Sequence, residues 1–369
     1  MIYFLLLTNK CNLRCKYCFE KAFDDFDVDF PEEIEELDNE IKFDTKDLYN
    51  LIANDPKPYI IFYGGEPTLR IDFIRKVVED LKNTKTKYII QTNGLLLKYI
   101  GNKYLKKFDS IFVSIDGCKK ITNANRGENT YEKVIDSLQF IRKKGYKKEV
   151  TARMVILNQN IYDEVTYLFK NKDFNFDSVH WQIDANFWFN DYKKRNFKNW
   201  LEMNYKPNLK KLVEFWYSNM KKGKVLKIYP FIGIMQNILD NTKTKLMCGA
   251  GYGNYAIQTN GKIIPCPIMA GMKNYYLGDI KKPILREIYI IPPRCKCCNY
   301  FDLCGGRCLY SNIVMPWPED QVNLVCKSTK YLIDLLKQKE EAIKKLINNN
   351  IIRRKDFDYL KYNGAEIIP

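Results

Sequence analysis

Short apolar runs alternate with longer amphipathic segments through the first half of the chain. The runs are rich in Ile, Val, Phe and Tyr and end at Gly, Asn or Asp, which is typical of buried strands followed by turns. The segments between them repeat apolar residues every three or four positions, which predicts helices. The predicted strands are residues 1–8, 58–63, 87–92, 110–116, 149–157 and 178–185. The predicted helices are residues 43–54 (capped by Asp44 or Thr45), 71–81, 97–107, 131–144 and 162–171.

This strand–helix–strand order predicts an α/β fold in which parallel strands are joined by right-handed crossovers. Ligands of such sheets bind at the carboxyl ends of the strands. We therefore expect functional side chains in the loops that follow the strands. On the sixth strand, Gln182 and Asp184 share a face that could line a site, whereas His180 is predicted to be a packed core residue.

The second half of the chain has a different pattern, with long helical periodicity and then many cysteines. Helices are predicted at residues 200–220, 231–241 and 327–349, and a polar tail at 351–369. An acidic loop is predicted at 23–40. The predicted domains are residues 1–185 (the parallel α/β domain), 186–245 (a helical connector), 246–330 (a small Cys-rich domain) and 331–369 (a C-terminal helix and tail).

Charge and cysteine content narrow the class of protein. The chain has 369 residues, a net charge of +16, 12 Cys and a single His. No signal-peptide pattern or membrane-length apolar run is present, so a cytoplasmic protein is predicted, with cysteines that bind metal rather than form disulfides. The single His argues against His-based zinc or acid–base chemistry. The basic residues are dispersed and accompany no nucleic-acid motif, so they predict a solvated surface that would also attract an acidic peptide.

Three of the cysteines, Cys11, Cys15 and Cys18, lie in the loop after the first strand, with three and then two residues between them. Three thiolates cannot fill the four corners of a [4Fe–4S] cluster, so one iron would stay open for chemistry. The alternatives are a zinc knuckle that lacks a ligand and three buried thiols. Lys and Arg between the cysteines argue against the buried thiols.

This spacing after a first strand resembles the signature of the radical SAM enzymes. The resemblance implies a partial parallel (β/α)6 barrel, a [4Fe–4S] cluster on Cys11, Cys15 and Cys18, and S-adenosylmethionine (SAM) chelated by the open iron. An electron from the cluster would then cleave SAM to a 5′-deoxyadenosyl radical that abstracts a substrate hydrogen. Tyr17 occupies the aromatic position that the family places beside the adenine.

Other strand ends carry residues that the resemblance assigns to SAM. Gly64, Gly65 and Glu66 match the family's Gly-Gly-Glu-Pro motif, which receives the methionine ammonium, although two glycines after a strand are also consistent with an ordinary tight turn. The remaining predicted SAM contacts are Asn93 after the third strand, Ser114 and Asp116 at the end of the fourth, and Arg126 twelve residues after Ser114. Asp116 would suit a ribose diol and Arg126 the SAM carboxylate.

A second group of cysteines resembles the SPASM extension of radical SAM enzymes that mature peptides and proteins. Paired zinc sites are the alternative, because four thiolates also suit zinc. The resemblance implies two auxiliary [4Fe–4S] clusters, for a total of three. The ligands of auxiliary cluster I would be Cys248, Cys266 and Cys308, and those of auxiliary cluster II would be Cys295, Cys298, Cys304 and Cys326.

Two departures from the SPASM pattern bear on function. Residues 241–247 contain no Cys to act as the fourth ligand of cluster I, which predicts an open iron there. Sulfatase-maturing members follow the second cluster I cysteine with a catalytic Asp, but Pro267 follows Cys266 in this chain. Cys297 is an additional cysteine that could serve as a spare ligand, and Cys118 is predicted to be a bystander.

These observations predict an oxygen-sensitive radical SAM oxidoreductase that modifies a peptide or protein. The resemblance extends to an archaeal-type group of peptide-modifying members. A thioether or C–C cross-link, or an oxidation, is the expected outcome, with the auxiliary clusters accepting an electron and a ferredoxin or flavodoxin acting as reductant. Maturation of a tetrapyrrole or another cofactor is the alternative, and sulfatase-type maturation is a weaker one. An iron–sulfur carrier is disfavoured because it has no use for Glu66, Ser114 and Arg126.

Overall fold

The computed structural model describes residues 1–18, 35–187 and 191–369. The chain forms two compact units. The first unit comprises Met1–Arg153, Asn171–Phe176 and Ala250–Tyr289, and the second comprises Met154–Lys170, Asp177–Gly249 and Ile290–Pro369. Most of the predicted acidic loop, and Trp188 and Phe189, lie outside the described residues.

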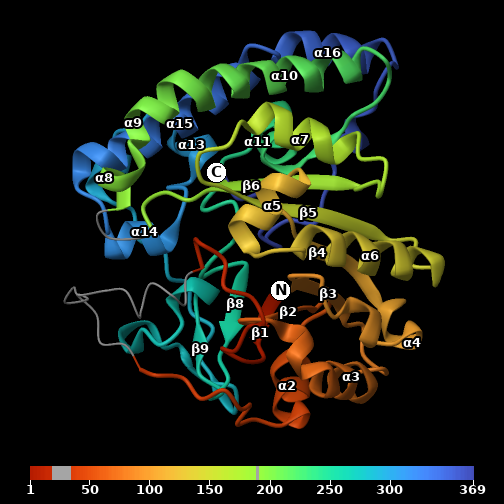
Figure 1. The fold of residues 1–369 in the computed structure, drawn as a ribbon. Helices are drawn as coiled ribbons and strands as arrows, with labels where there is room; N and C mark the ends of the chain where they lie inside the picture. Colours follow the sequence, from red (N-terminus) through yellow and green to blue (C-terminus); the bar gives the residue numbers. More distant parts are fainter. Residues whose placement is uncertain (19–34, 188–190) are drawn as a thin grey trace. The chain divides into compact units, whose positions relative to one another are not determined.

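The first unit is built on a mostly parallel sheet with the strand order β5-β4-β3-β2-β1-β8-β9 (Figure 1). Strand β1 lies between β2 and β8 and pairs in parallel with both. All five residues of β1 are buried, which explains why its sequence is continuously apolar rather than alternating. The strands are β1 (Ile2–Leu6), β2 (Tyr59–Tyr63), β3 (Lys87–Thr92), β4 (Phe108–Ser114), β5 (Glu149–Ile156), β8 (Asn254–Ile257) and the antiparallel β9 (Ile263–Ile264).

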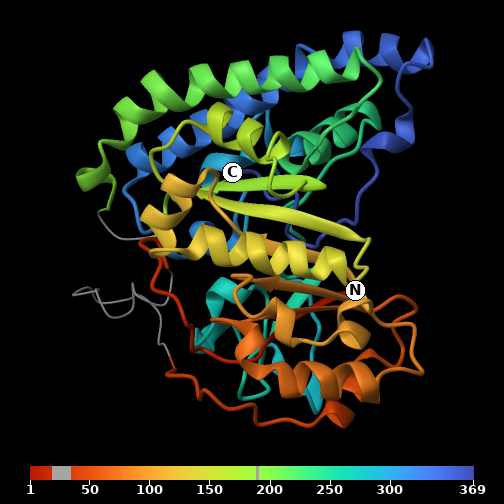
Figure 2. The same cartoon turned by 45° about the vertical axis from the view of Figure 1, so that its right-hand side comes forward.

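Helices join the strands of the first unit, and α2 and α3 lie together on one side of β1–β3 (Figures 1 and 2). Asp44 caps α2 through a capping box with Asp47, as the cap prediction required. The helices are α2 (Thr45–Ile52), α3 (Ile71–Asp80), α4 (Asn102–Leu105), α5 (Lys119–Arg126) and α6 (Thr130–Lys143), with 3-10 turns at Pro67–Arg70, Leu97–Tyr99, Pro267–Met269 and Lys273–Tyr275. A small hairpin pairs β10 (Gly278–Asp279) with β11 (Lys282–Pro283).

The second unit surrounds the parallel pair β6 (Ser178–Ile183) and β7 (Lys227–Ile228) with helices. The long helices α10 and α15 pack side by side, as Figures 1 and 2 show. Its helices are α7 (Ile161–Phe169), α8 (Asp191–Arg195), α9 (Phe197–Trp200), a π-helical turn (Leu201–Tyr205), α10 (Lys206–Met220), α11 (Tyr229–Leu239), α12 (Pro293–Lys296), α13 (Phe301–Cys304), α14 (Leu309–Val314), α15 (Glu319–Lys337), α16 (Glu340–Asn348) and a 3-10 turn at Arg354–Phe357.

The α/β class and all six predicted strands are confirmed, with ends that shift by one or two residues. The helix predicted at 97–107 is wrong, because Gly101 has a φ of 92° and separates a 3-10 turn from α4. The single helix predicted at 327–349 is also wrong: it begins earlier, after Pro318, and divides into α15 and α16. Strand β7, with only two residues, was not predicted.

The C-terminal segment differs from the predicted polar tail. Asn363, Ala365, Glu366 and Ile368 are buried within the second unit. The side chain of His180, which is fully buried as predicted for a core residue, bonds through Nε2 to the carbonyl oxygen of Ile367 at 3.3 Å. The last residues of the chain therefore form part of the core around β6.

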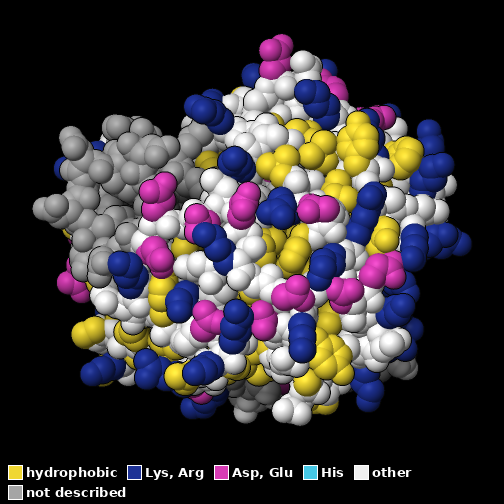
Figure 3. Space-filling model, turned by 90° about the horizontal axis from the view of Figure 1, so that it is seen from below, with side chains coloured by type: hydrophobic (Ala, Val, Ile, Leu, Met, Phe, Trp, Pro, Cys, Tyr) yellow, Lys and Arg dark blue, Asp and Glu magenta, His cyan; other side chains and the backbone are white. Residues whose placement is uncertain are grey.

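The surface carries the basic excess without a large single-sign region on the face shown in Figure 3, where Lys and Arg alternate with Asp and Glu. In the described ranges, no helix has the length and apolar character needed to cross a membrane.

Candidate functional site

The loop that follows β1 carries three cysteines that form no disulfide. Cys11, Cys15 and Cys18 are half-buried. Burial raises the pKa of the Cys11 thiol to about 11, and the charges of Cys15 and Cys18 contribute in the same direction. A thiol that resists ionisation in the absence of a cation fits a metal-cluster ligand, because the positive charge of the iron–sulfur core would stabilise its thiolate.

The Gly-Gly-Glu turn after β2 packs directly on this Cys loop. The backbone N–H of Gly65 donates to the Thr8 carbonyl at 2.7 Å, and that of Glu66 donates to the Lys10 carbonyl at 2.9 Å. A Cβ on Gly65 would lie only 2.4 Å from the Lys10 carbonyl oxygen. In the structure these glycines let the turn approach the backbone of the Cys loop.

A Gly65→Ala substitution is therefore expected to displace the Cys loop. The added Cβ meets backbone atoms, which cannot swing aside as a side chain would. SAM cleavage should fall by about 100-fold, the cost of misplacing reacting groups by roughly 1 Å. The readouts are 5′-deoxyadenosine formation and iron content. Gly145→Ala is the control: at a φ of 88° it also strains the backbone, but its Cβ would meet only the Lys106 side chain, at 3.8 Å, and no atom of the Cys loop. It should keep SAM cleavage, and full retention of activity by Gly65→Ala would contradict this packing.

Glu66 connects the ends of two strands through its buried carboxylate. Oε1 accepts hydrogen bonds from the Thr68 N–H at 2.9 Å, the Thr68 hydroxyl at 2.5 Å and the Thr92 hydroxyl at 2.6 Å. Oε2 accepts from the Asn93 N–H at 2.7 Å. Burial raises the pKa of Glu66, and these donors oppose the rise. Both carboxylate oxygens thus have protein donors, and the role of Glu66 toward the SAM ammonium stays a prediction.

Asn93 extends this connection to the cysteines. Its Nδ2 donates to Asn12 Oδ1 at 2.7 Å and lies 3.9 Å from Cys11 Sγ. The end of β3 therefore contacts the Cys loop, at the side of Cys11.

A buried cluster joins Tyr17 with the predicted SAM-binding residues Asp116 and Arg126. Asp116 accepts from Arg126 through both oxygens, at 2.7 and 3.1 Å, and from the Tyr17 hydroxyl at 2.6 Å. The Arg126 guanidinium also lies 5.3 Å from the centre of the Tyr17 ring. Burial is the largest single effect on Arg126 and lowers its pKa, but Asp116, Tyr17 and Cys15 together outweigh burial and keep the pKa of Arg126 above its usual value. Ser114 is half-buried at the end of β4, in the same unit.

Sequence reasoning assigned these residues separately and missed that they contact one another. Asp116 and Tyr17 are 99 positions apart, so no local spacing reveals the contact. In this structure Asp116 and Arg126 pair with each other, and their roles toward the ribose and the carboxylate of SAM stay predictions.

Cysteines of the second unit line one cavity. The residues around it include all four predicted ligands of auxiliary cluster II (Cys295, Cys298, Cys304 and Cys326), together with Cys308. Burial raises the pKa of Cys304 to about 12 and also raises that of Cys295, and the charge of Cys326 adds to both. In the described ranges no three metal-binding side chains converge on a single-ion position. The donor set of the cavity fits a thiolate-ligated cluster.

The predicted ligands of auxiliary cluster I are divided between the units. Cys248 and Cys308 belong to the second unit and Cys266 to the first. Cys308, which was assigned to cluster I, lines the cavity of the cluster II cysteines. The ligand set of cluster I therefore stays a prediction. Cys297 is exposed and Cys118 is half-buried.

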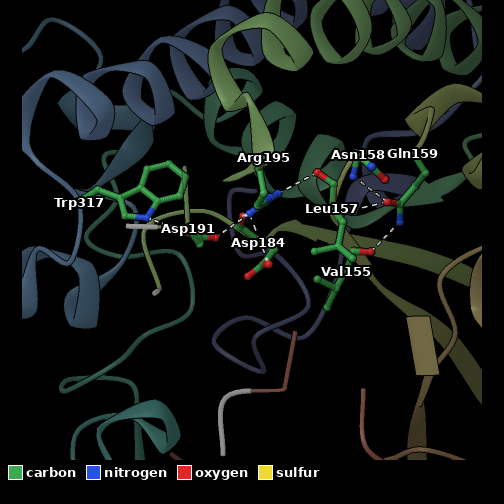
Figure 4. A network of polar contacts seen from close by, with 8 residues as sticks. All are labelled: Val155, Leu157, Asn158, Gln159, Asp184, Asp191, Arg195 and Trp317. Atoms are coloured by element: carbon green, nitrogen blue, oxygen red, sulfur yellow. Dashed lines mark hydrogen bonds and ion pairs between the residues drawn. The ribbon is translucent and has the colours of Figure 1, made fainter. Parts of the chain in front are cut away.

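A polar network holds the carboxyl end of β6 (Figure 4). Arg195 Nη1 donates to the Asp184 carbonyl and lies 3.4 Å from Asp184 Oδ2 and 3.1 Å from Asp191 Oδ2, while Nη2 donates to the Leu157 carbonyl at 2.8 Å. The indole N–H of Trp317 donates to Asp191 Oδ1 at 2.6 Å. Asp184 was predicted to line a site. In the structure its carboxylate faces Arg195, a residue that the sequence analysis did not single out.

Removal of the Arg195 guanidinium from this network should make the free energy of unfolding depend on pH. Burial raises the pKa of Asp191, and Arg195 opposes the rise. In Arg195→Met the folded-state pKa of Asp191 rises further above its unfolded value, so stability is retained at low pH and lost as pH rises through the folded-state pKa. The urea midpoint should therefore fall more at pH 7.5 than at pH 5. Arg353→Met, at an exposed ion pair, is the control, and equal losses at both pH values would contradict this account.

The chain is similar to several known proteins. Residues 5–170 match the Radical SAM superfamily. The chain is 27% identical over 376 residues to the cysteine-type anaerobic sulfatase-maturating enzyme of Clostridium perfringens, covering 92% of this chain and 96% of that enzyme. It is 25% identical over 347 residues to the radical SAM cyclopropyl synthase TigE of Paramaledivibacter caminithermalis, covering 84% of this chain and 69% of that protein.

A solved structure of a similar protein, native anSMEcpe with bound AdoMet and the Cp18Cys peptide, superposes with a TM-score of 0.71 at 25% identity. The superposition covers 95% of this chain and 99% of that one. The superfamily match includes the Cys loop, and the longer similarities extend through the second cysteine region. Residues 5–170 thus match the Radical SAM superfamily, and the near full-length similarities and the shared α/β fold agree with that match.

Proposed function

We propose that this enzyme modifies a peptide or protein, beginning with the removal of a hydrogen atom from a substrate carbon. Similarity along nearly the whole chain to a protein solved with both AdoMet and a peptide is the observation that carries the proposal. The first unit of this chain has the groups that such a reaction requires. Cys11, Cys15 and Cys18 would hold the [4Fe–4S] cluster, and bound SAM would supply the 5′-deoxyadenosyl radical.

The residues around the Cys loop position this chemistry. The turn at Gly64 and Gly65 fixes the backbone of the Cys loop, and Asn93 supports it at Cys11. Arg126 supplies a buried cation, which Asp116 orients through two hydrogen bonds. A guanidinium so oriented is suited to a carboxylate such as that of SAM, and Tyr17, stacked against it, would face the adenine.

The second cysteine region would hold auxiliary clusters, so that the chain carries three clusters in all. We assign auxiliary cluster II to Cys295, Cys298, Cys304 and Cys326, because all four line one cavity. These clusters would accept the electron that leaves the substrate, and a ferredoxin or flavodoxin would reduce the SAM cluster. The dispersed basic surface would favour an acidic peptide.

Two product classes have separate support. Cross-link formation, as a thioether or a C–C bond, is favoured by Pro267, which replaces the acid expected of sulfatase-maturing members. Sulfatase-type oxidation of one residue is the second candidate, favoured by the 27% identity to a sulfatase-maturating enzyme across 92% of this chain. Tandem mass spectrometry of a treated peptide separates them, because a cross-link joins two residues and an oxidation alters one.

The first test is anaerobic reconstitution followed by assays of iron, sulfide and 5′-deoxyadenosine. Three clusters require about twelve irons per chain, and SAM with dithionite should yield 5′-deoxyadenosine. Addition of Cys-containing peptides of acidic and basic sequence should then give a peptide product with the acidic series preferred. Zinc in place of iron, or the absence of 5′-deoxyadenosine, would overturn the proposed function.

A further inference from the structure

A buried arginine faces the cysteine-lined cavity of the second unit. Arg307 lies between Gly306 and Cys308, is only 9% exposed and lines the cavity. Its Nε donates to the Pro369 carbonyl oxygen at 3.3 Å, which fixes the guanidinium. Its Nη2 is buried and has no hydrogen-bond partner among the described residues.

Without a ligand in the cavity, an arginine in this position lowers the stability of the fold. The backbone of Arg307 has a φ of 61°, a conformation that residues other than Gly rarely adopt. Such backbone strain is concentrated at functional sites. A buried guanidinium N–H without an acceptor also bears a desolvation cost. An anionic group in the cavity would offset both costs.

The cysteines supply that anion when they bind iron. Four thiolates outweigh the positive charge of a [4Fe–4S] core, so the bound cluster is negative, and it becomes more negative when reduced. Arg307 lines the same cavity as these sulfur atoms. A fixed cation and an N–H donor at this position would stabilise the reduced cluster more than the oxidised one.

We infer that Arg307 is a positioning residue that donates Nη2–H to the iron–sulfur cluster held by Cys295, Cys298, Cys304 and Cys326, and that it raises the reduction potential of this cluster. The inference rests on the proposed auxiliary cluster. Its consequence is that the cluster accepts one electron more readily, without a proton, because the arginine stays charged throughout.

Arg294 provides a matched comparison on the same cavity. It also lines the cavity, but it is half-buried, and both of its terminal nitrogens have partners: Nη2 in Asn312 Oδ1 at 3.0 Å and Nη1 in Met315 Sδ at 3.3 Å. Only its Nε is buried without a partner among the described residues. Removal of its charge should therefore affect the cluster less than removal of Arg307.

The test uses the full chain with Cys11, Cys15 and Cys18 replaced by Ala, so that the SAM cluster does not contribute. Arg307→Gln, Arg307→Lys and Arg294→Gln are reconstituted in this background, and dye-mediated redox titration is followed by EPR. The cluster is assigned by loss of its signal in Cys304→Ser. At a fixed potential near the midpoint, Arg307→Gln should lower the reduced-to-oxidised ratio at least tenfold, a shift of about 59 mV for a one-electron couple. Arg307→Lys should shift less, and Arg294→Gln least.

The outcomes separate this inference from the proposed function. An unchanged midpoint in Arg307→Gln, with iron retained, overturns the inference and leaves the auxiliary cluster in place. Loss of iron from both Arg307 variants overturns it too, because the residue would then be needed for cluster assembly rather than for potential. A parent chain without iron, or a signal unaffected by Cys304→Ser, overturns the assigned auxiliary cluster and the inference with it.

Discussion

Cys11→Ala is expected to abolish reductive cleavage of SAM while iron stays bound in the second cysteine region. Cys11 is one of only three thiols in the loop after β1, and Cys15 and Cys18 alone cannot hold the SAM cluster. Loss of an outer partner of a metal ligand typically costs 10–100-fold, so loss of a ligand should lower 5′-deoxyadenosine formation by more than about 100-fold. Mass spectrometry measures the product, and iron and sulfide assays count the remaining clusters.

Cys297→Ala is the matched control, because Cys297 is exposed and does not line the cavity of its neighbours. It should retain both iron and SAM cleavage. Cleavage that persists in Cys11→Ala would show that the catalytic cluster lies elsewhere in the chain. Loss of all iron from Cys11→Ala would show instead that the cysteine regions do not bind iron independently.

Asp116→Asn is expected to destabilise the first unit strongly. The Asp116 side chain is 0% exposed and that of Arg126 only 6%, and the substitution leaves the arginine charged and buried without its counterion. Breaking such a pair by removal of one partner typically costs about 3–5 kcal/mol. The Tyr17 hydroxyl also loses its charged acceptor, which should loosen the loop that carries Cys15 and Cys18. Urea denaturation measures the first effect and SAM binding the second.

Glu132→Gln is the control for Asp116→Asn. Glu132 also pairs with a cation of α5, Lys119, but on the surface, where solvent screens the interaction. Its effect on the urea midpoint should be much smaller. If Asp116→Asn unfolds at the same urea concentration as the parent chain, the buried pair does not stabilise the fold, and Arg126 would be available to a ligand without it.

The fold could be predicted wherever the pattern was local. The buried runs at β1 to β6 were visible because parallel strands covered on both faces are continuously apolar. Strand β7 could not be predicted, since its two residues are too few to show the apolar pattern of a strand. The burial of residues 363–369 could not be predicted either, because it depends on how this segment packs in the core around His180 and not on the composition of the segment.

In the candidate site, too, local sequence patterns were predictive and long-range contacts were not. Cysteine spacing predicted the metal-binding residues, and the strand ends predicted Glu66, Asn93 and Asp116 as functional candidates. The spacing did not reveal what these side chains contact: Gly65 meets Lys10, Asp116 meets Tyr17, and Arg195 meets Asp184. Such contacts are set by which loops the sheet brings to one edge, and a linear pattern does not contain that information.

The position of β1 between β2 and β8 has a consequence for biosynthesis. The partner strand β8 begins at Asn254, so one edge of the apolar strand β1 has no partner until the ribosome has added roughly 250 more residues. At 5–20 residues per second this interval is on the order of ten seconds to a minute. During that time the nascent chain has an open, aggregation-prone edge beside its cysteine loop. Because β1 and β8 are far apart in the sequence, we expect the nascent chain to bind chaperones before the two strands pair. We also expect cluster insertion to follow the pairing of β8 with β1.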